Sequence, residues 1–413
     1  GVVGFGSFSK SFIELFLKHP DIERVVGAEF LEDRRTEVME KYGLDAMYSS
    51  FDEMIEKDKD INCVAIFAQR HQHGPLIIKS LKAGKHVYSA VPMALDIEEI
   101  KEIVRLAGET GLTYSMGETG IYRPAAIYCR QQYATGEMGD MVYAEAQYNH
   151  DIRNMEGSFR SSGGEDWKKF AGIPPMWYPT HSTAMILSTM PGVYAKKVVA
   201  LGFAGSPRTD IYGTEGQNIY NNPFSNTTML LELSNGGIAR LCENRCIGWV
   251  APETYIAQYY GTDGGYEFSV ARHSLCTWKE DGKTTKMVDV SAELQPKDVM
   301  DNINENYEDA IQKIAEGAGW GETYPIQSRE RLPREYDGMV NGHNGTHHFI
   351  IDDFCRAYET GKLSPTNIWA VARYNIPGLT AQKSALAGGV PMDVIDLGDP
   401  PADWEVLPDG VSD

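Results

Sequence analysis

The sequence has no apolar run of about 20 residues, the length that a membrane-spanning helix requires. It has no internal repeats and no low-complexity tract, and positive charge is scarce, since 38 Lys and Arg stand against 58 Asp and Glu. A net charge of −20 repels phosphate backbones and anionic lipid, so we expect neither nucleic acid nor a membrane as a partner. The binding pocket is not constrained by this charge, because a pocket can be locally basic.

Cysteine is also rare. Six cysteines scattered over 413 residues are typical of reduced, mostly buried thiols rather than of a disulfide framework. Cys242 and Cys246 lie close together, but no second Cys or His pair follows at zinc spacing, and we expect no metal there. No signal peptide is visible, and because the sequence begins without Met we expect a few upstream residues to be missing. A cytoplasmic location is the default expectation.

The length of the chain predicts two domains, because 413 residues exceed the size of a single hydrophobic core. Residues 1–120 alternate strand and helix signals, which predicts an α/β Rossmann domain around a parallel sheet. Cys63–Ala68 is a continuous apolar run, as expected for a strand buried on both faces. The predicted strands are Gly1–Gly4, Arg24–Phe30, Cys63–Ala68, His86–Ser89 and Leu112–Met116, and the predicted helices are Phe8–Lys18, Arg34–Tyr42, Pro75–Lys82 and Ile97–Ala107.

After residue 120 strands follow one another without helices between them. Residues 121–413 are therefore predicted to form an α+β domain with an open, mainly antiparallel sheet. Asn235-Gly236-Gly237 predicts a hairpin within Thr227–Cys242. Trp167-Lys168-Lys169 is expected to be a solvated loop and Ala315–Gly342 a surface excursion. The other predicted strands are Asp140–Tyr148, Thr254–Tyr260, Gly265–Val270 and Met287–Val290, and the predicted helices are Pro124–Tyr133, Ser182–Leu187, His347–Glu359 and Ile368–Ala387, of which the last two are expected to pack back on the first domain.

A glycine-rich turn, Gly4-Phe5-Gly6-Ser7-Phe8-Ser9, has the first two glycines of the dinucleotide fingerprint and Ser9 at the third position. It follows a predicted strand and opens a helix, and Glu29 ends the second strand, where a carboxylate can accept hydrogen bonds from a ribose. These features predict bound NAD rather than NADP, although Arg34 and Arg35 keep NADP open. The alternative is a turn without a ligand and a solvated Glu29.

Five segments in order resemble the Gfo/Idh/MocA family of NAD(P)-dependent sugar and cyclitol oxidoreductases, and the resemblance covers nearly the whole chain. They are the glycine turn, Glu29, Phe67-Ala68-Gln69-Arg70-His71-Gln72-His73, Ala83-Gly84-Lys85-His86-Val87 and Gly136-Glu137-Met138-Gly139-Asp140. The resemblance implies that a cofactor lies against Gly4, Gly6, Ser7, Phe8, Ser9, Glu29, Arg34, Ala68, His71, His73 and Val91. It also implies a small-molecule sugar or glycoside as substrate.

One departure from the family concerns the residue before Pro92. Most members have a lysine there, which hydrogen-bonds the reacting hydroxyl, but this sequence has Val91, which neither donates nor holds charge. Valine at this point resembles the branch that hydrolyses glycosides, including α-N-acetylgalactosaminidases, which oxidises the sugar, eliminates the leaving group, adds water and returns the hydride. By that resemblance Glu118, Tyr148, Tyr178 and His181 surround the sugar.

The same residues have non-functional interpretations. His181 could take a hydroxyl proton near neutral pH, or bond backbone at a helix start. Tyr148 and Tyr178 could be plain aromatic packing, whereas Glu118 follows a strand at the carboxyl edge of the sheet, where open α/β sheets bind ligands. His150 and Asp151 either line the sugar pocket or cap the next segment; they are candidate substrate residues. His343, His347 and His348 have spacing suggestive of a metal, but by resemblance they lie near the pocket mouth, and no metal is predicted.

Three functions remain open. The first is an NAD-dependent oxidoreductase acting on a ring hydroxyl of a sugar, glycoside or cyclitol, and the second is an NAD-assisted glycosidase with no net redox change. The third is a catalytically silent binding relative, because a fold does not imply a function. A homo-oligomer, dimer or tetramer, is expected because the exposed face of an open sheet often pairs with another subunit.

Overall fold

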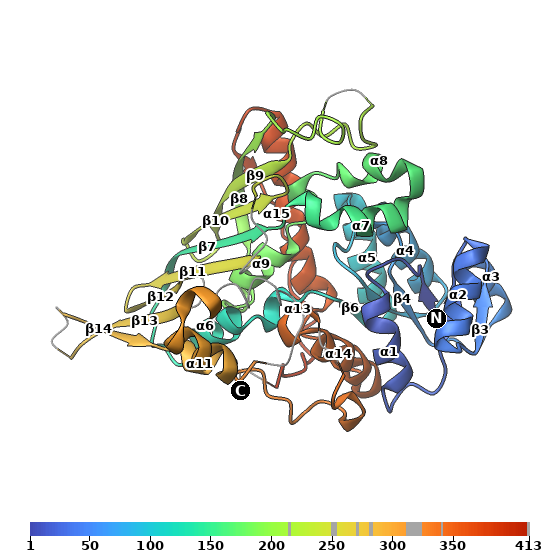
Figure 1. Cartoon of the computed structure of the whole chain (residues 1–413), viewed down its shortest axis with the longest axis horizontal. Helices are drawn as coiled ribbons and strands as arrows, with labels where there is room; N and C mark the ends of the chain where they lie inside the picture. Colours follow the sequence, from blue (N-terminus) through green and yellow to red (C-terminus); the bar gives the residue numbers. More distant parts are fainter. Residues whose placement is uncertain are drawn as a thin grey trace.

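The strands of the chain form two separate sheets (Figure 1). The computed structural model describes residues 1–213, 216–248, 254–269, 272–280, 284–310, 324–339 and 342–410. The first sheet has the order β3-β2-β1-β4-β5-β6, and all its neighbours pair in parallel. This is the doubly wound order of a Rossmann fold, which confirms the predicted class. Its strands are β1 (Val2–Val3), β2 (Val26–Ala28), β3 (Ala46–Tyr48), β4 (Cys63–Ile66), β5 (His86–Ser89) and β6 (Tyr114–Met116).

Helices connect these strands and cover the sheet. In the longest of them, Asp96 accepts the first-turn N–H of Glu98 and Gly111 ends the helix with φ +68°, a conformation that favours glycine. β3 and α3 were not predicted, because both are short and β3 is only half-buried. The helices are α1 (Lys10–Lys18), α2 (Glu32–Tyr42), α3 (Phe51–Lys57), α4 (His73–Lys82) and α5 (Ile97–Thr110).

The second sheet has nine strands in the order β14-β13-β12-β11-β7-β10-β9-β8-β16. All neighbours pair antiparallel except β7 and β10, so the sheet is mainly antiparallel, as predicted. The predicted hairpin is present between β9 and β10, where Gly236 has φ +88°. The strands are β7 (Met141–Asn149), β8 (Ala195–Phe203), β9 (Asn226–Leu233), β10 (Ile238–Asn244), β11 (Tyr255–Gly261), β12 (Gly264–Ser269), β13 (Arg272–Trp278), β14 (Thr285–Asp289) and β16 (Met392–Asp393).

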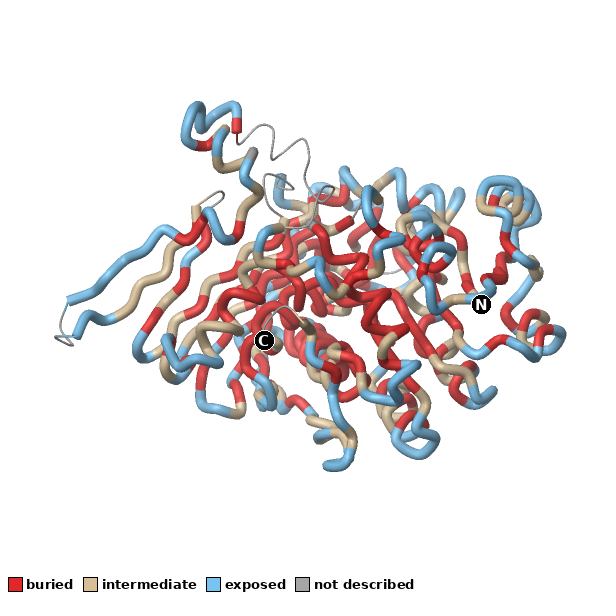
Figure 2. The backbone as a smooth tube through the Cα atoms, turned by 90° about the horizontal axis from the view of Figure 1, so that it is seen from below, coloured by how far each residue is buried: buried red, intermediate tan, exposed pale blue. Residues whose placement is uncertain are grey.

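Helices cover one face of this second sheet, and the other face is open. Residues of β9 alternate between buried and exposed, as expected for a strand with one covered face. Figure 2 shows the buried core in the middle of the molecule and the hairpin of β13 and β14 projecting from it, in which β14 is exposed along its whole length. β8, β13 and β16 were not predicted, and Val270, the predicted end of one strand, lies outside the described residues. The open face exposes Val142, Leu201, Phe203, Leu230 and Ile238.

The remaining helices join the two sheets. α14 packs against α1, and α15 packs against α5 and β8, so both C-terminal helices contact the Rossmann sheet and its helices. The boundary at residue 120 stays a prediction. None of the helices described combines the length and apolar character needed to cross a membrane. The helices are α6 (Pro124–Ala134), α7 (Ile152–Gly163), α8 (Trp167–Ala171), α9 (Thr180–Leu187), α10 (Ser291–Leu294), α11 (Lys297–Glu305), α13 (Gly342–Gly345), α14 (His347–Thr360) and α15 (Ile368–Leu386).

One local prediction, the loop at Trp167, is corrected by the structure, and another, the surface excursion, lies partly outside the described residues. The predicted solvated loop at Trp167 is wrong: Trp167 begins α8 and is buried against Ile152 and Phe159 of α7, which itself was not predicted. Polar and apolar residues are mixed in the segment of α7 and α8 without a clear helical period, so the sequence did not indicate helices there. Burial against neighbouring segments stabilises them. Residues 315–323, 340 and 341 of the predicted surface excursion Ala315–Gly342 lie outside the described residues.

Candidate active site

A cavity of about 1010 Å³ lies at the carboxyl ends of the parallel strands, which is where open α/β sheets bind ligands. One side is lined by the glycine turn and by the residues that follow β2, β4 and β5. The other side is lined by α7 and by the end of β7. Its volume is that of a ligand site. Among the lining residues are the predicted cofactor residues Gly4, Gly6, Ser7, Phe8, Glu29, Arg34, Ala68, His71, His73 and Val91.

The glycine turn is shaped for a phosphate. Gly4 has φ +88°, and a Cβ there would lie 2.9 Å from the backbone nitrogen of Ala68, so a larger residue would clash with the loop after β4. Ser9 Oγ donates to the carbonyl of Gly6 at 2.9 Å, and Ser9 is buried behind the turn rather than on the cavity wall. The first turn of α1 has no acidic residue, so the partial positive charge of the helix start is left for an anion.

Glu29 is buried at the end of β2 and anchors the turn. Its Oε2 accepts the N–H of Phe5 at 3.0 Å, and its Oε1 accepts the N–H of Leu31 at 3.0 Å. Each carboxylate oxygen retains a second lone pair, which can accept a ribose hydroxyl. Arg34 Nη1 lies 3.6 Å from Glu29 Oε2. The residues at this end therefore fit a dinucleotide.

Helix α7 covers the glycine turn. A Cβ on Gly6 would lie 3.6 Å from Cβ of Ser162, near the C-terminal end of α7. Two side chains of the Rossmann domain donate to backbone carbonyls there: Gln69 Nε2 to Ser162 at 3.0 Å and Arg34 Nη2 to Ser161 at 2.6 Å. The cofactor end of the cavity is therefore enclosed between the two domains.

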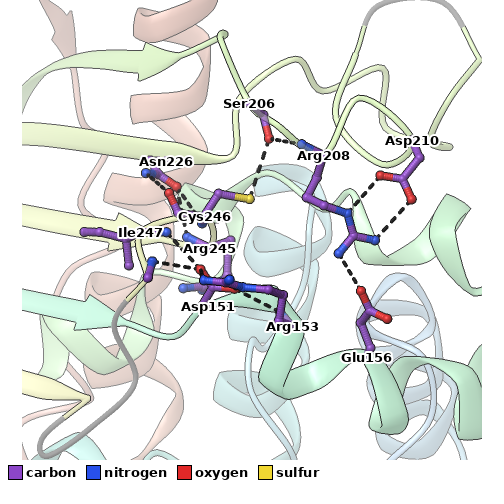
Figure 3. A network of polar contacts seen from close by, with 11 residues as sticks. Asp151, Arg153, Glu156, Ser206, Arg208, Asp210, Asn226, Arg245, Cys246 and Ile247 are labelled. Atoms are coloured by element: carbon purple, nitrogen blue, oxygen red, sulfur yellow. Dashed lines mark hydrogen bonds and ion pairs between the residues drawn. The ribbon is translucent and has the colours of Figure 1, made fainter.

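The start of α7 is fixed by Asp151 (Figure 3). Its carboxylate accepts the N–H of Arg153 at 3.1 Å, of Ile247 at 3.1 Å and of Gly248 at 2.9 Å, and it pairs with the Arg153 guanidinium at 2.8 Å. Burial acts to raise the pKa of Asp151, but these donors outweigh it and lower the pKa below its usual range. The Asp151 carboxylate caps α7, the alternative that the sequence left open, and Asp151 is not among the described residues that line the cavity. A substrate role of Asp151 stays a prediction.

Arg208 ties the segment after β8 to the same helix (Figure 3). Its guanidinium bonds Glu156 on α7 and Asp210 at 2.9 Å and 3.1 Å. Glu156 lies one turn beyond the cap, so α7 is anchored both at its start and along its first turns. This network lies on the outer side of α7, and none of these three residues lines the cavity.

The predicted residues Glu118 and His181 are in direct contact. Glu118 follows β6 and His181 lies in the first turn of α9; Oε1 of Glu118 accepts the N–H of Gly120 at 2.6 Å and lies 2.8 Å from Nδ1 of His181. Glu118 is 0% exposed, and its Oε2 has no hydrogen-bond partner among the described residues. An ionised carboxylate only accepts, so Nδ1 carries the proton and Nε2 of His181 is the basic nitrogen.

Aromatic rings surround His181. The ring centroid of His181 lies 5.0 Å from that of Tyr148, 5.2 Å from Tyr178, 5.3 Å from Tyr255 and 6.3 Å from His343. Tyr148, Tyr178 and His343 line the cavity, whereas His181 is 2% exposed and lies directly behind them. All four predicted catalytic residues therefore come together, with the two tyrosines on the wall and the Glu118–His181 pair in the next layer.

Tyr148 and His150 form a second pair on the wall. The Tyr148 hydroxyl lies 2.7 Å from Nδ1 of His150. Burial lowers the pKa of His150 to about 3 and raises the pKa of Tyr148 above its usual range. The neutral phenol therefore donates to the neutral imidazole. His150, unlike Asp151, lines the cavity.

The loop histidines have structural contacts. The ring nitrogens of His73 lie 2.7 Å from the carbonyl of Pro92 and 3.0 Å from that of Ala68, which ties together the loops after β4 and β5. Burial lowers the pKa of His73 to about 4. His71 stacks on Phe170 of α8 with centroids 5.6 Å apart. Val91 lines the cavity between these loops and presents only an apolar surface.

His343 is a wall residue that the sequence indicated only as part of a histidine cluster. Its Nδ1 lies 2.6 Å from Nε2 of His347, and its ring lies 6.0 Å from that of Phe8 in the glycine turn. Burial, and next the neighbouring His347, lower its pKa well below the usual value. No group of three metal-ligating side chains is found in the part of the chain that the structure describes. Arg245 and Tyr255 were also missed as site residues, because no motif distinguishes them from core residues. Arg70 lies in one of the five segments but was not singled out there.

Known proteins resemble the chain at several levels. Residues 1–118 match the model of a family described as an oxidoreductase family with an NAD-binding Rossmann fold. Over these residues the chain is similar to the Gfo/Idh/MocA oxidoreductases. The match lies in the cofactor domain, which carries four of the five segments named above.

Two curated proteins are distantly similar to this chain. A trans-1,2-dihydrobenzene-1,2-diol dehydrogenase of Mus musculus is 26% identical over 174 residues, 42% of this chain and 50% of that protein. A glycosyl hydrolase family 109 protein of Bacteroides fragilis is 34% identical over 135 residues, 31% of each chain. The matches thus span half or less of these relatives' lengths. A levoglucosan dehydrogenase solved with NADH and L-sorbose has a TM-score of 0.71 at 17% identity, covering 96% of this chain and 98% of that one, and shows the same fold.

Proposed function

We propose that this chain binds NAD and oxidises a ring hydroxyl of a sugar, glycoside or cyclitol. The observation that carries the proposal is the 2.8 Å contact between Glu118 and His181, directly behind a cavity that begins at a glycine turn. Gly4, Glu29 and the free N-terminus of α1 fit a dinucleotide at the other end of that cavity. Bound NAD supplies the hydride acceptor for the carbon that carries the hydroxyl.

The chain's own residues then handle the proton. When the substrate enters between Tyr148 and Tyr178, Nε2 of His181 behind them accepts the proton of the hydroxyl, and the buried Glu118 carboxylate stabilises the resulting imidazolium at Nδ1. Tyr148 donates a hydrogen bond to a sugar oxygen in place of the one it makes to His150. Tyr178 supports the apolar face of the sugar ring, as aromatic side chains do in carbohydrate-sized pockets.

A second candidate function begins with the same oxidation and ends in glycoside hydrolysis. In it the leaving group is eliminated, water is added and the oxidation is reversed, so that no net redox change results. Two observations favour it: Val91 offers no proton donor beside the cofactor turn, and one relative is a glycosyl hydrolase family 109 protein. The enclosure of the turn by α7 also suits a cofactor that stays bound through turnover.

The purified protein, loaded with NAD, is incubated with a panel of aryl glycosides and free sugars. Accumulation of reduced cofactor supports the dehydrogenase, and release of the aryl group without it supports the glycosidase. No turnover with any substrate, despite NAD binding by calorimetry, contradicts both and leaves the silent binding relative.

We also propose that the chain acts in the cytoplasm as a homo-oligomer. The open face of the second sheet supports an oligomer, because Leu201, Phe203 and Ile238 expose about half or more of their area there. Its six cysteines are free thiols, which suits a reducing compartment. Light scattering measures the assembly, and a monomer at all concentrations contradicts it.

A further inference from the structure

The substrate end of the cavity is basic although the chain is acidic. We define this end by the lining residues Arg70, Tyr148, His150, Tyr178, Arg245 and His343. Of the described residues that line the cavity, Glu29 alone is a carboxylate, and it lies at the opposite end on the N–H groups of Phe5 and Leu31. Two guanidinium groups therefore face the substrate end in a protein of net charge −20.

Arg245 comes from the second sheet. It follows β10, is 5% exposed, and its guanidinium carbon lies 4.5 Å from the ring centroid of Tyr148 and 5.8 Å from that of Tyr178. Its Nη2 lies 3.2 Å from Oε2 of Glu243, whose Oε1 accepts the Ser182 hydroxyl at 2.5 Å. Burial raises the pKa of Glu243 to about 8 against the opposing charge of Arg245, so this carboxyl compensates the guanidinium only in part.

Arg70 comes from the Rossmann domain. It begins the turn after β4, and its guanidinium carbon lies 4.8 Å from the ring centroid of Tyr178 and 5.3 Å from that of Phe159. No carboxylate among the described residues forms an ion pair with it. Arg70 and Arg245 thus reach the same tyrosine from different domains.

A neutral sugar would leave Arg70 without a charged partner and Arg245 with Glu243 alone. When a ligand displaces water from the cavity, an uncompensated guanidinium loses hydration, and only an anion of the ligand replaces it fully. The planar fork of guanidinium donors matches the paired oxygens of a carboxylate, sulfate or phosphate. Two such forks beside the aromatic pair Tyr148 and Tyr178 combine an anion site with a surface for a sugar ring.

We propose, on the basis of the function proposed above, that the substrate is a sugar or glycoside carrying an oxyanion, which Arg70 and Arg245 bind. The oxyanion is the carboxylate of a uronic acid or a sulfate or phosphate ester on the ring. The ring hydroxyl that reacts lies toward His181, and the anionic substituent lies toward the guanidinium groups of Arg70 and Arg245.

Matched substrates test this proposal. Aryl glycosides that differ only at the terminal carbon, as alcohol, carboxylate, sulfate or phosphate, are compared by kcat/KM in the gluco and galacto series. The anionic members are expected to exceed their neutral partner by about 10- to 100-fold, as charge-assisted hydrogen bonds allow, and the best arm identifies the oxyanion. Equal or better turnover of the neutral member overturns the proposal while leaving the proposed function intact.

Binding measurements separate the proposed oxyanion site from the proposed catalytic function. If no glycoside is turned over, the proposed function fails, and calorimetry of free uronates, sugar phosphates, sugar sulfates and neutral sugars with the NAD-loaded protein decides the anion site. Tighter binding of an anionic sugar than of its neutral partner supports the site, and equal affinity overturns it.

Variants of Arg70 test whether its guanidinium binds the anionic substituent of the substrate. Arg70→Gln is expected to lower the ratio of anionic to neutral kcat/KM by about 10-fold, and Arg70→Lys, which keeps the charge but not the fork, to lower it less. Arg105→Gln on exposed α5 is the matched control. If Arg70→Gln weakens NAD binding by calorimetry and leaves the ratio unchanged, Arg70 serves the cofactor and the proposal is overturned.

Discussion

Glu118 and His181 are 63 positions apart in the sequence, yet Oε1 of one lies 2.8 Å from Nδ1 of the other. The contact joins the carboxyl end of β6 in the Rossmann sheet to the first turn of α9 under the second sheet. It fixes the tautomer of the imidazole and supplies a buried negative charge for the protonated ring. The proposed acid–base centre is therefore formed at the junction of the two domains.

Glu118→Gln is expected to lower kcat by about 100-fold or more, because glutamine keeps the shape but cannot stabilise the imidazolium. His181→Ala is expected to abolish whichever activity is found. Steady-state kinetics measure both, and Glu109→Gln on the surface of α5 is the control. Near-wild-type turnover of a folded His181→Ala protein would rule out the assignment.

Tyr148→Phe is expected to reduce kcat/KM by about 10-fold, the equivalent of one lost hydrogen bond to the substrate. The fold should be retained, since the ring still packs on Tyr255, 4.9 Å away. Steady-state kinetics with the substrate identified in the panel assay compare Tyr148→Phe with the unaltered protein. Tyr260→Phe, at a tyrosine outside the cavity lining, is the matched control. An unchanged kcat/KM would show that the Tyr148 hydroxyl bonds only His150.

NAD is expected to bind at least about 10-fold more tightly than NADP, because the buried Glu29 carboxylate repels a 2′-phosphate. Calorimetry with both dinucleotides measures the difference. Arg34→Gln should not reduce this preference for NAD over NADP, since Arg34 already contacts the Glu29 carboxylate and donates to the carbonyl of Ser161. An equal or reversed preference would refute this role of Glu29.

Gln69→Ala is expected to speed NAD dissociation by about fivefold, because one hydrogen bond that holds α7 over the glycine turn is lost. Stopped-flow fluorescence during displacement of NAD gives the rate, and Gln132→Ala on α6 serves as the matched control. A rate equal to that of the unaltered protein would mean that α7 does not retain the cofactor.

The stability of the protein is expected to fall as the pH drops below about 6.5, where unfolded histidines take up protons. Burial lowers the pKa of His73 to about 4, so the folded state does not bind that proton until well below pH 5. When the pH falls from 7 to 5, His73 alone should lower the free energy of unfolding by about 2 kcal/mol. Urea unfolding of wild type and His73→Asn at both pH values tests this, and an equal loss in the two proteins argues against it.

The parallel order of the first sheet could be predicted because its strands are buried on both faces and its helices carry regular apolar stripes. His86–Ser89 was predicted with its observed bounds for this reason. β3 and β8 escaped prediction, since a half-buried or alternating strand has no such unbroken signal. α7 escaped as well, because its buried positions are few and its partners lie in distant segments.

The glycine turn, Glu29 and the departure at Val91 were determined by the sequence alone, because local backbone geometry and side-chain chemistry require particular residues at neighbouring positions. The partners of His181, the capping role of Asp151 and the meeting of Arg70 with Arg245 at one tyrosine were decided only by the tertiary structure. Those contacts join residues that are far apart in the sequence, and no local pattern encodes which distant side chains burial brings together.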